Sequence, residues 1–336
     1  MIKKVLIILV VALGVNSNAQ TKFTIPSEDF IAFHNNVSSA ERMFLNDSLL
    51  QAYAKYDIAF NNYKGAINPS HYFKAALCAL KIKEEFKALT FLEKAITNGY
   101  EIDSIYKSSI TFNNKNTREE YYSNIGKWEA VRDAGRNTNW ENELYASVEV
   151  SKKYNSGSYK TAVDYCTACL KNPKCNKTLP DYLSKYKMVK EKMKADSVQA
   201  AALLKNIQSY GFPNMKLVDK KACGFARNIL LNYDADKKNE RMDVMLFKAM
   251  NDGYISPAFY AQVVDRRNLM NGLAPEFYEP LMGYEKTIGK DLVTANQKRS
   301  KIGLYNIIMP NAAALKGVDT KDTKAYSKAF VSLYDY

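Results

Sequence analysis

Six ionic side chains in the last third of the chain are of types that could do acid–base chemistry. They are Asp234, Glu240, Asp265, Arg266, Arg267 and Arg299. Two carboxyl groups on either side of a glycosidic bond can hydrolyse it, one as an acid and the other as a base or nucleophile. Nothing in the sequence brings two of these acids together. We therefore favour a structural role, in which Asp265 forms a buried ion pair or cap with Arg299 or a backbone amide. Asp234, Asp265, Arg266 and Arg299 are the candidates if a catalytic site exists.

Histidine chemistry is nearly excluded in this part of the chain. The only two histidines are His34 and His71, both in the first quarter of the sequence. Catalysis by a Ser-His-Asp or Cys-His set needs a histidine beside the nucleophile. The sequence also contains no His-Glu-x-x-His zinc motif, Walker loop or dinucleotide-binding glycine pattern. We predict no metal and no cofactor, and we expect that the chain is not an enzyme.

The five cysteines are Cys78, Cys166, Cys169, Cys175 and Cys223, an odd number that cannot all pair. Cys166 and Cys169 are one helical turn apart, and Cys175 follows in a loop, so one disulfide would fit in an oxidising compartment. A zinc site needs about four ligands, and a redox Cys-x-x-Cys would open a helix after a strand. We favour packed free thiols, with a disulfide as the alternative and metal or redox chemistry last.

The apolar residues recur with the helical period almost everywhere, and no stretch alternates with a period of two. This pattern predicts an all-α fold. One long amphipathic segment is expected over 38–61, and two short helices over 71–99, separated at 81–84 and stopped by Asn98-Gly99. Further on, Thr117 and Glu120 have capping-box spacing. A lysine-rich helix is expected from about Leu179 to the break at 210–214.

The segment 71–99 resembles a tetratricopeptide repeat. Its aromatic, small and alanine positions are matched by Tyr72, Ala76, Ala88, Leu92 and Ala95, although the closing proline of the motif is absent. A more degenerate copy has Gly157, Tyr159 and Ala162, with Cys166 and Cys169 in place of the usual aromatic and alanine. The resemblance implies a stack of helical hairpins over residues 20–210.

The remainder, 211–336, resembles a compact helical domain of unknown function that occurs in exported bacterial proteins, often behind tetratricopeptide-like helices. The resemblance is carried by a Gly-x-Ile-x-Pro start to a helix that ends in Asp-Arg, followed by Arg-x-x-Ile-Gly-Leu. Its residues are Gly253, Ile255, Pro257, Tyr260, Ala261, Val264, Asp265, Arg266, Gly272, Asn296, Arg299, Ile302, Gly303 and Leu304.

Two parts of this chain depart from that family pattern. A His-Ala-Asp stretch of the family corresponds to Asn232-Tyr233-Asp234, which keeps the acid and loses the histidine. A Gln-x-Tyr-Gly-Thr turn corresponds to residues 276–280, Glu-Phe-Tyr-Glu-Pro. If those polar residues form a site in the family, the departures imply that it is weakened or lost here.

The first nineteen residues have the parts of a cleavable signal peptide, which predicts export. Lys3 and Lys4 precede an apolar run that is too short to span a bilayer, and Ser17 and Ala19 fit the cleavage site before Gln20. We expect a periplasmic or secreted protein with no transmembrane segment after cleavage.

The charge of the chain is strongly basic, and the excess is concentrated in one segment. The net charge falls from +13 to +11 when Lys3 and Lys4 are removed. Residues 151–195 carry eleven lysines against three acids. Export makes an anionic envelope polymer a better partner than nucleic acid, although a solvated lysine face remains the favoured interpretation.

The sequence as a whole predicts a scaffold that binds a protein or peptide in the bacterial cell envelope. Stacked hairpins offer a concave surface for recognition and need no catalytic groups. Two alternatives remain open, an envelope hydrolase that uses the carboxy-terminal acids and arginines, and an adhesive or structural protein that holds anionic polymers through residues 151–195.

Overall fold

The computed structural model describes residues 26–108, 110–152, 157–172, 174–233, 240–270, 272–279, 292–304 and 306–307. Regular structure in these ranges is helical throughout and includes no strand, so the all-α prediction is confirmed. The predicted signal peptide 1–19 and Asp234 lie outside the described residues. Within the described residues, no helix combines the length and apolar character that a membrane span requires.

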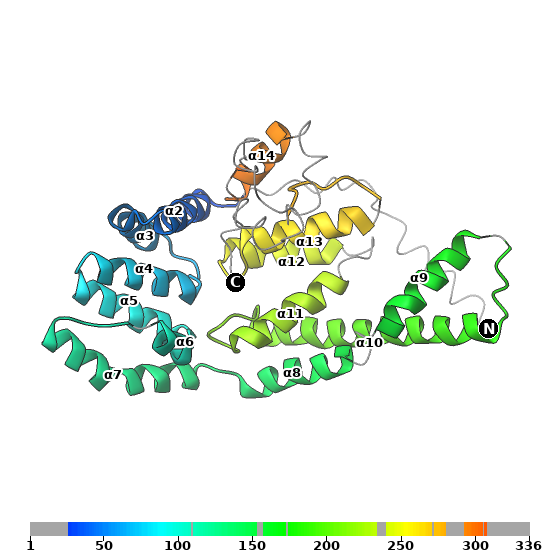
Figure 1. Cartoon of the computed structure of the whole chain (residues 1–336), viewed down its shortest axis with the longest axis horizontal. Helices are drawn as coiled ribbons and strands as arrows, with labels where there is room; N and C mark the ends of the chain where they lie inside the picture. Colours follow the sequence, from blue (N-terminus) through cyan, green and yellow to red (C-terminus); the bar gives the residue numbers. More distant parts are fainter. Residues whose placement is uncertain are drawn as a thin grey trace, which may run out of the picture.

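The first part of the fold is a layered set of helical hairpins, here called the helical stack. It comprises α2 (Glu28–Leu45), α3 (Leu49–Asn62), α4 (Pro69–Lys81), α5 (Glu85–Thr97), the short α6 (Ile102–Lys107) and α7 (Lys115–Ala134). Helix α2 packs on α3, α3 on α4, α4 on α5 and α5 on α7 (Figure 1). Close approach of α4 and α5 is allowed by small residues, since Ala76 and Ala88 are completely buried.

The single long segment predicted over 38–61 is wrong, because the chain turns sharply between α2 and α3. Asp47 has φ 57°, and the amide of Ser48 donates back to the carbonyl of Met43 at 2.8 Å. This is a left-handed helix stop made by a polar residue instead of glycine. The predicted break at 81–84 is confirmed and uses the same device, with Lys83 at φ 67°.

Two further local predictions need correction. Helix α7 is capped by Asn114, whose side-chain oxygen accepts from the amides of Asn116 and Thr117 at 2.9 and 3.2 Å. Thr117 is therefore inside the first turn and is not the cap. Helix α13 (Pro257–Met270) begins at the predicted proline but continues past Asp265 and Arg266 for another turn.

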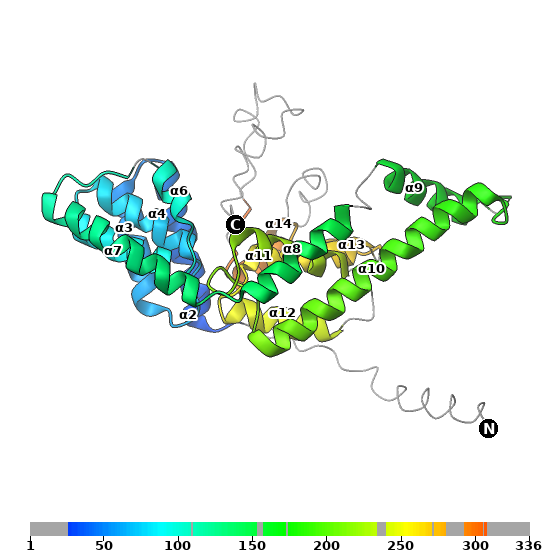
Figure 2. The ribbon, with the colours of Figure 1, turned by 90° about the horizontal axis from the view of Figure 1, so that it is seen from below.

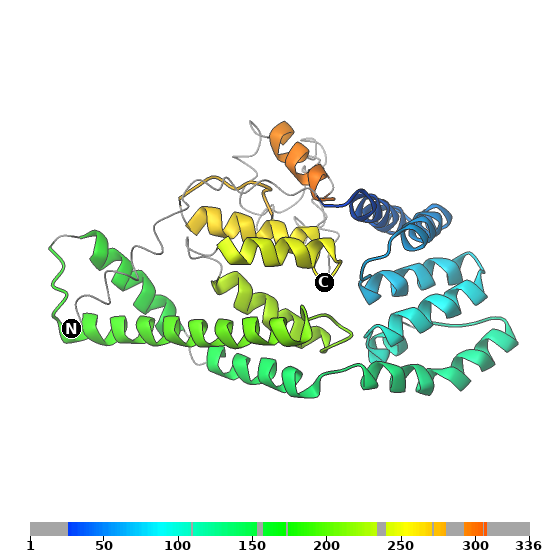
Figure 3. The same ribbon diagram turned by 180° about the vertical axis from the view of Figure 1, so that it is seen from behind.

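The second part of the fold surrounds one long helix, α10 (Pro180–Tyr210). It is completed by α8 (Thr138–Lys152), α9 (Gly157–Lys171), α11 (Lys220–Tyr233), α12 (Glu240–Asn251), α13 and α14 (Leu292–Lys301). Helix α10 contacts α8, α9 and α11, while α13 contacts α11 and α12. Figures 2 and 3 show that α9 and the start of α10 project from the rest as an arm.

The arm has a small core of its own, formed by Cys166, Cys169 and Tyr182. Cys169 forms a disulfide with Cys175, with Cα atoms 5.2 Å apart. A turn in which the amide of Cys175 donates to the carbonyl of Asn172 returns the chain to α9 and brings the two thiols together. The preference for packed free thiols is therefore wrong for this pair, although Cys166 is a buried free thiol.

One buried apolar cluster runs from Phe30 to Leu304 and joins the helical stack to the later helices. Helix α10 ends at Tyr210, where the sequence places the domain boundary. Phe212 and Val218 after that boundary nevertheless belong to the same cluster as Trp140 before it. The helices on the two sides of that boundary thus share a core.

Candidate functional site

Asp265 is completely buried in α13 and binds the backbone of the turn at residues 276–279. Its carboxylate accepts from the amides of Glu276, Phe277 and Glu279 at 2.5, 2.9 and 2.6 Å. Burial raises the pKa of Asp265, and the three amide bonds work against that shift. Among the described residues, its hydrogen bonds are thus all to backbone amides of the chain itself.

Arg299, in α14, holds the same turn from the other side. Its guanidinium is 2% exposed and donates to the carbonyl of Phe277 at 2.8 Å. It also pairs with Glu279 at 3.1 Å. Burial raises the pKa of Glu279, and the charge of Arg299 opposes that shift. Arg299 therefore pairs with Glu279 and not with Asp265, and both predicted residues position residues 276–279.

The remaining predicted residues lie apart from this turn. Arg266 is exposed and its Nη2 is 3.3 Å from the side-chain oxygen of Asn232. Arg267 pairs with Asp243 at 2.5 Å, and Glu240 is the first residue of α12. Asp265 and Arg299 are thus buried structural groups, Arg267 is half-buried and Arg266 is exposed, and none of these four lines the large cavity of the molecule.

That cavity has a volume of about 560 Å³ and lies between the helical stack and the later helices. The stack contributes α2 at Phe33 and His34, the α3–α4 connection over 64–69, and Asn98 after α5. The opposite wall is formed by residues 214–217, by Cys223 and Arg227 of α11, and by residues 253–256 before α13. Its size is in the range of sites for small ligands.

Both histidines of the chain line this cavity, and each is 3% exposed. Nδ1 of His71 lies 3.2 Å from Oε1 of the buried Glu41, which also accepts from Lys74 at 2.8 Å. Burial raises the pKa of Glu41, but the hydrogen bonds and charges of His71 and Lys74 outweigh that effect and lower it. His71 thus lies beside an ionised carboxylate behind the cavity wall.

His34 differs because neither of its ring nitrogens has a hydrogen-bond partner among the described residues. Its ring packs against Phe30 and Phe33, with centroids 4.4 and 5.0 Å away. Burial, with a smaller contribution from His71, lowers the pKa of His34 to about 3. The imidazole is therefore neutral near pH 7, with one donor and one acceptor to offer.

Cys223 also lines the cavity, so the fold brings a thiol and both histidines to one place. The sequence argues against a Cys-His set because no histidine follows residue 210. In the fold, however, the two histidines from the start of the chain line the same cavity as Cys223. The protonation states still disfavour such a set, because burial raises the pKa of Cys223 to about 12. A neutral thiol is a poor nucleophile. The described residues also include no group of three or more His, Cys, Asp or Glu side chains that could hold a metal ion.

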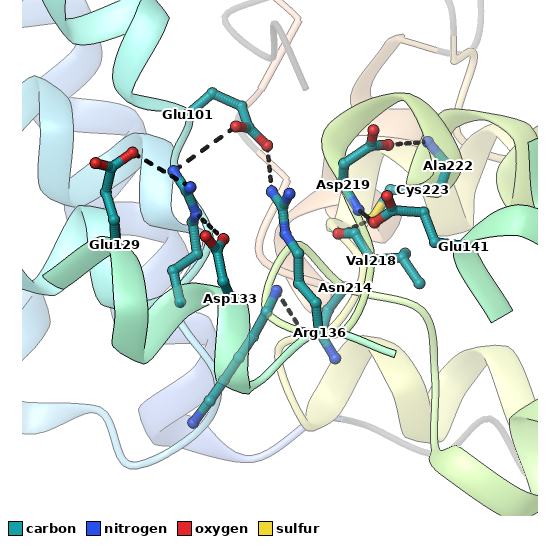
Figure 4. A network of polar contacts seen from close by, with 12 residues as sticks. Glu101, Glu129, Asp133, Arg136, Glu141, Asn214, Val218, Asp219, Ala222 and Cys223 are labelled. Atoms are coloured by element: carbon teal, nitrogen blue, oxygen red, sulfur yellow. Dashed lines mark hydrogen bonds and ion pairs between the residues drawn. The ribbon is translucent and has the colours of Figure 1, made fainter. Parts of the chain in front are cut away.

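The cavity is closed on one side by the loop at residues 211–219, here called the closing loop. Figure 4 shows polar contacts of this loop with Glu141 of α8, beside the ion pairs at the end of the stack. Arg136 pairs with Glu101, and the amide of the next residue, Asn137, donates to the carbonyl of Leu217 at 2.7 Å. The carboxylate of Glu141 accepts from the amide of Asp219 at 2.8 Å, and Asp219 in turn accepts from Ala222 at 2.7 Å (Figure 4).

The opposite side is closed by the turn after α12. Oδ1 of Asn251 accepts from the amide of Ser27 at 2.9 Å, and its carbonyl accepts from the hydroxyl of Tyr63 at 3.2 Å. The amide of Ala66 donates to the carbonyl of Asp252 at 2.9 Å. These bonds fix the start of α2 and the α3–α4 connection against the later helices.

Two glycines of the carboxy-terminal resemblance lie at contacts with the stack. Gly253 has φ +85°, and a Cβ there would lie 2.1 Å from the carbonyl oxygen of Ala66. Gly303 has φ +76°, and its Cβ would lie 3.1 Å from Cβ of His34. Only glycine allows both the conformation and the approach at residue 253. Their role in this chain is to let the two parts close around the cavity.

The comparisons with known proteins find no relative. No family model matches the sequence, and neither the curated proteins nor the solved structures include one similar to it. The tetratricopeptide-like and carboxy-terminal resemblances therefore stay predictions, and the site rests on its geometry alone.

Proposed function

We propose that the chain is a binding protein that holds a peptide, or an exposed segment of a partner protein, in the cavity between the helical stack and the later helices. The observation that carries the proposal is the 560 Å³ cavity itself, which both parts of the fold line. We further propose that the protein acts in the periplasm or outside the cell, after removal of residues 1–19.

The walls of the cavity support recognition more than catalysis. The lining includes apolar side chains such as Phe33 and Ile67 and polar ones such as Asn68 and Asn98. A mixed lining of this kind suits peptide side chains and backbone groups together. Hydrolysis by paired acids is not proposed, since Asp265 and Glu279 both serve the turn at 276–279.

A peptide library displayed on phage, selected against residues 20–336, tests this function. Lys64 is exposed at the cavity, and Lys64→Trp would fill its mouth. Lys81 is exposed at the far end of α4, and Lys81→Trp is the matched control. Selected peptides should bind the wild type and the control alike, and bind Lys64→Trp about tenfold more weakly or worse. Selection of nothing, or of peptides that ignore Lys64→Trp, contradicts the proposal.

A second function is favoured by the arm. Lys174, Lys177, Lys187, Lys190 and Lys194 are all exposed on it, and it projects from the body (Figure 2). We propose that the arm holds an anionic polymer through these lysines. Binding to poly-L-glutamate should weaken with salt, and Lys187→Glu should bind the polymer more weakly than the control Lys81→Glu does. Binding that is independent of salt, or equal in the two variants, excludes this role.

A further inference from the structure

We propose that the cavity receives a carboxylate group of its ligand, with His34 as the buried donor and Arg227 and Lys64 supplying positive charge. The inference rests on the proposed binding function and names the chemistry that the cavity selects. It is carried by the charges of the lining, the helices that start there and the unpartnered imidazole.

The charged residues that line the cavity are all basic among the described residues. Lys64 and Lys216 are exposed, and Arg227 is half-buried, with its guanidinium over the ring of Phe259 at 5.6 Å. No aspartate or glutamate belongs to the described lining. Behind the lining, Glu41 lies beside His71 and pairs with Lys74. An anion entering the cavity therefore meets attraction from several directions.

Two helices begin at the cavity and add to this field. Helix α4 starts at Pro69 after Asn68, and α13 starts at Pro257 after Ser256. Asn68, Pro69 and Ser256 all line the cavity. The N-terminus of a helix is equivalent to about half a positive charge. Both starts thus favour a negative group.

The first amides of these helices are already bonded, which limits what kind of anion fits. The side chain of Asn68 accepts from Ser70 at 2.9 Å, and that of Ser256 accepts from Phe259 at 3.1 Å. Phosphate sites at helix starts use several free amides as donors. Here the helices contribute a field but few donors, which suits a carboxylate with a single charge better than a phosphate.

His34 supplies the donor that the helix starts do not. Its side chain is 3% exposed, lines the cavity and has no partner at either ring nitrogen in the part of the chain that the structure describes. A buried polar group without a partner costs about 1–3 kcal/mol, which a ligand acceptor would recover. A carboxylate beside it would also favour the protonated ring, since an opposite charge raises the pKa of an imidazole.

The test uses residues 20–336 with labelled histidine, and succinate, neutral succinamide and inorganic phosphate as probes at constant ionic strength. The chain has only two histidines, so His34 is followed by NMR while calorimetry gives the affinity. We expect succinate to bind, to shift the His34 resonances and to raise its pKa, and succinamide to do neither. Arg227→Gln and Lys64→Gln should each weaken succinate by about fivefold or more, and Lys81→Gln should not. Thermal unfolding verifies that each variant is folded.

Several results would overturn this inference without touching the proposed function. These are equal binding of succinamide and succinate, tighter binding of phosphate, or affinities unchanged by Arg227→Gln and Lys64→Gln. A peptide selected for the cavity should likewise lose affinity when its carboxyl groups are amidated. If it keeps its affinity, the cavity binds peptides but not through a carboxylate. If succinate binds as expected but no peptide is selected, the carboxylate site stands and the peptide function fails.

Discussion

The turn at residues 276–279 and the cavity wall at His34 both bury polar atoms, but they treat them differently. In the turn, Asp265 accepts three backbone amides and Arg299 donates to a carbonyl and to Glu279. In the wall, His34 is equally buried and both of its nitrogens lack partners in the described structure.

Under our proposal, this difference separates groups that hold the fold from a group that can bind a ligand. Buried polar groups in native proteins are nearly always bonded, so each exception calls for an explanation. Asp265 and Arg299, which the sequence marks as candidates for chemistry, are bonded by the protein itself. His34, which the sequence does not single out as a site residue, has both ring nitrogens without partners among the described residues and lines a cavity.

The largest effect is expected from Asp265→Ala. The substitution would leave the amides of Glu276, Phe277 and Glu279 buried without an acceptor, and should lower the free energy of unfolding by about 4 kcal/mol. Urea denaturation measures it. Asp265→Asn keeps one acceptor oxygen and should lose less. A loss below about 1 kcal/mol for Asp265→Ala would mean that the turn is not held by this carboxylate, and the contrast with His34 would lose its basis.

The second effect is a pH dependence that belongs to His34. The pKa of His34 is lowered from 6.5 to about 3 in the folded chain. Between pH 6.5 and pH 3, the imidazole is therefore protonated in the unfolded chain and neutral in the folded chain. Stability is thus complete above pH 6.5 and falls as the pH drops. The loss from His34 alone should reach about 3 kcal/mol at pH 4.

His34→Leu isolates this contribution from the carboxylates, including Glu41, which also titrate in acid. The difference in the free energy of unfolding between wild type and His34→Leu should change between pH 7 and pH 4 by the amount above. A difference that stays constant over this range would show that the imidazole takes up its proton at the same pH in the folded chain as in the unfolded chain. It would then be a satisfied group like those of the turn.

The third effect concerns the contact that closes the cavity. In Gly253→Ala, the new methyl would meet the carbonyl of Ala66 and the backbone would be strained at φ +85°, so we expect a loss of about 2 kcal/mol or more. Gly126 is the matched control, because it lies inside α7 with nothing within 4 Å of a Cβ. Gly126→Ala should stabilise by up to about 1 kcal/mol. Thermal unfolding of both variants gives the comparison, and a neutral Gly253→Ala would mean that the closure is loose.

The sequence predicts the helices well and the site poorly, for physical reasons that these residues illustrate. Helical periodicity and proline starts are local signals, which is why α4, α5, α10 and α13 begin near their predicted positions. The stop at Asp47 was missed because a non-glycine residue at φ 57° leaves no clear trace in composition. Asn114 and Thr117 are both good cap residues, and local spacing alone chooses the wrong one.

The cavity could not be predicted, because it depends on contacts between distant residues. His34 and Arg227 meet the same space only because Gly253 and Gly303 let the later helices close on the stack. The glycines were noted from the carboxy-terminal resemblance, but their neighbours Ala66 and His34 are about two hundred residues or more away in sequence. The rarity of histidine was the one usable signal for the site, because the chain has only two histidines and both line the cavity.

The smallest effect is expected at Arg266, the immediate neighbour of Asp265 in α13. Its side chain is exposed, and its contact with Asn232 at 3.3 Å is long for a hydrogen bond. Arg266→Ala should change the free energy of unfolding by no more than about 0.5 kcal/mol, against about 4 kcal/mol for Asp265→Ala. Urea denaturation of both variants under the same conditions makes this comparison. Two adjacent residues of one motif would then differ because one faces the buried turn and the other faces water. If Arg266→Ala instead destabilises as much as Asp265→Ala, the motif acts as one buried unit, and burial in the structure does not separate its members.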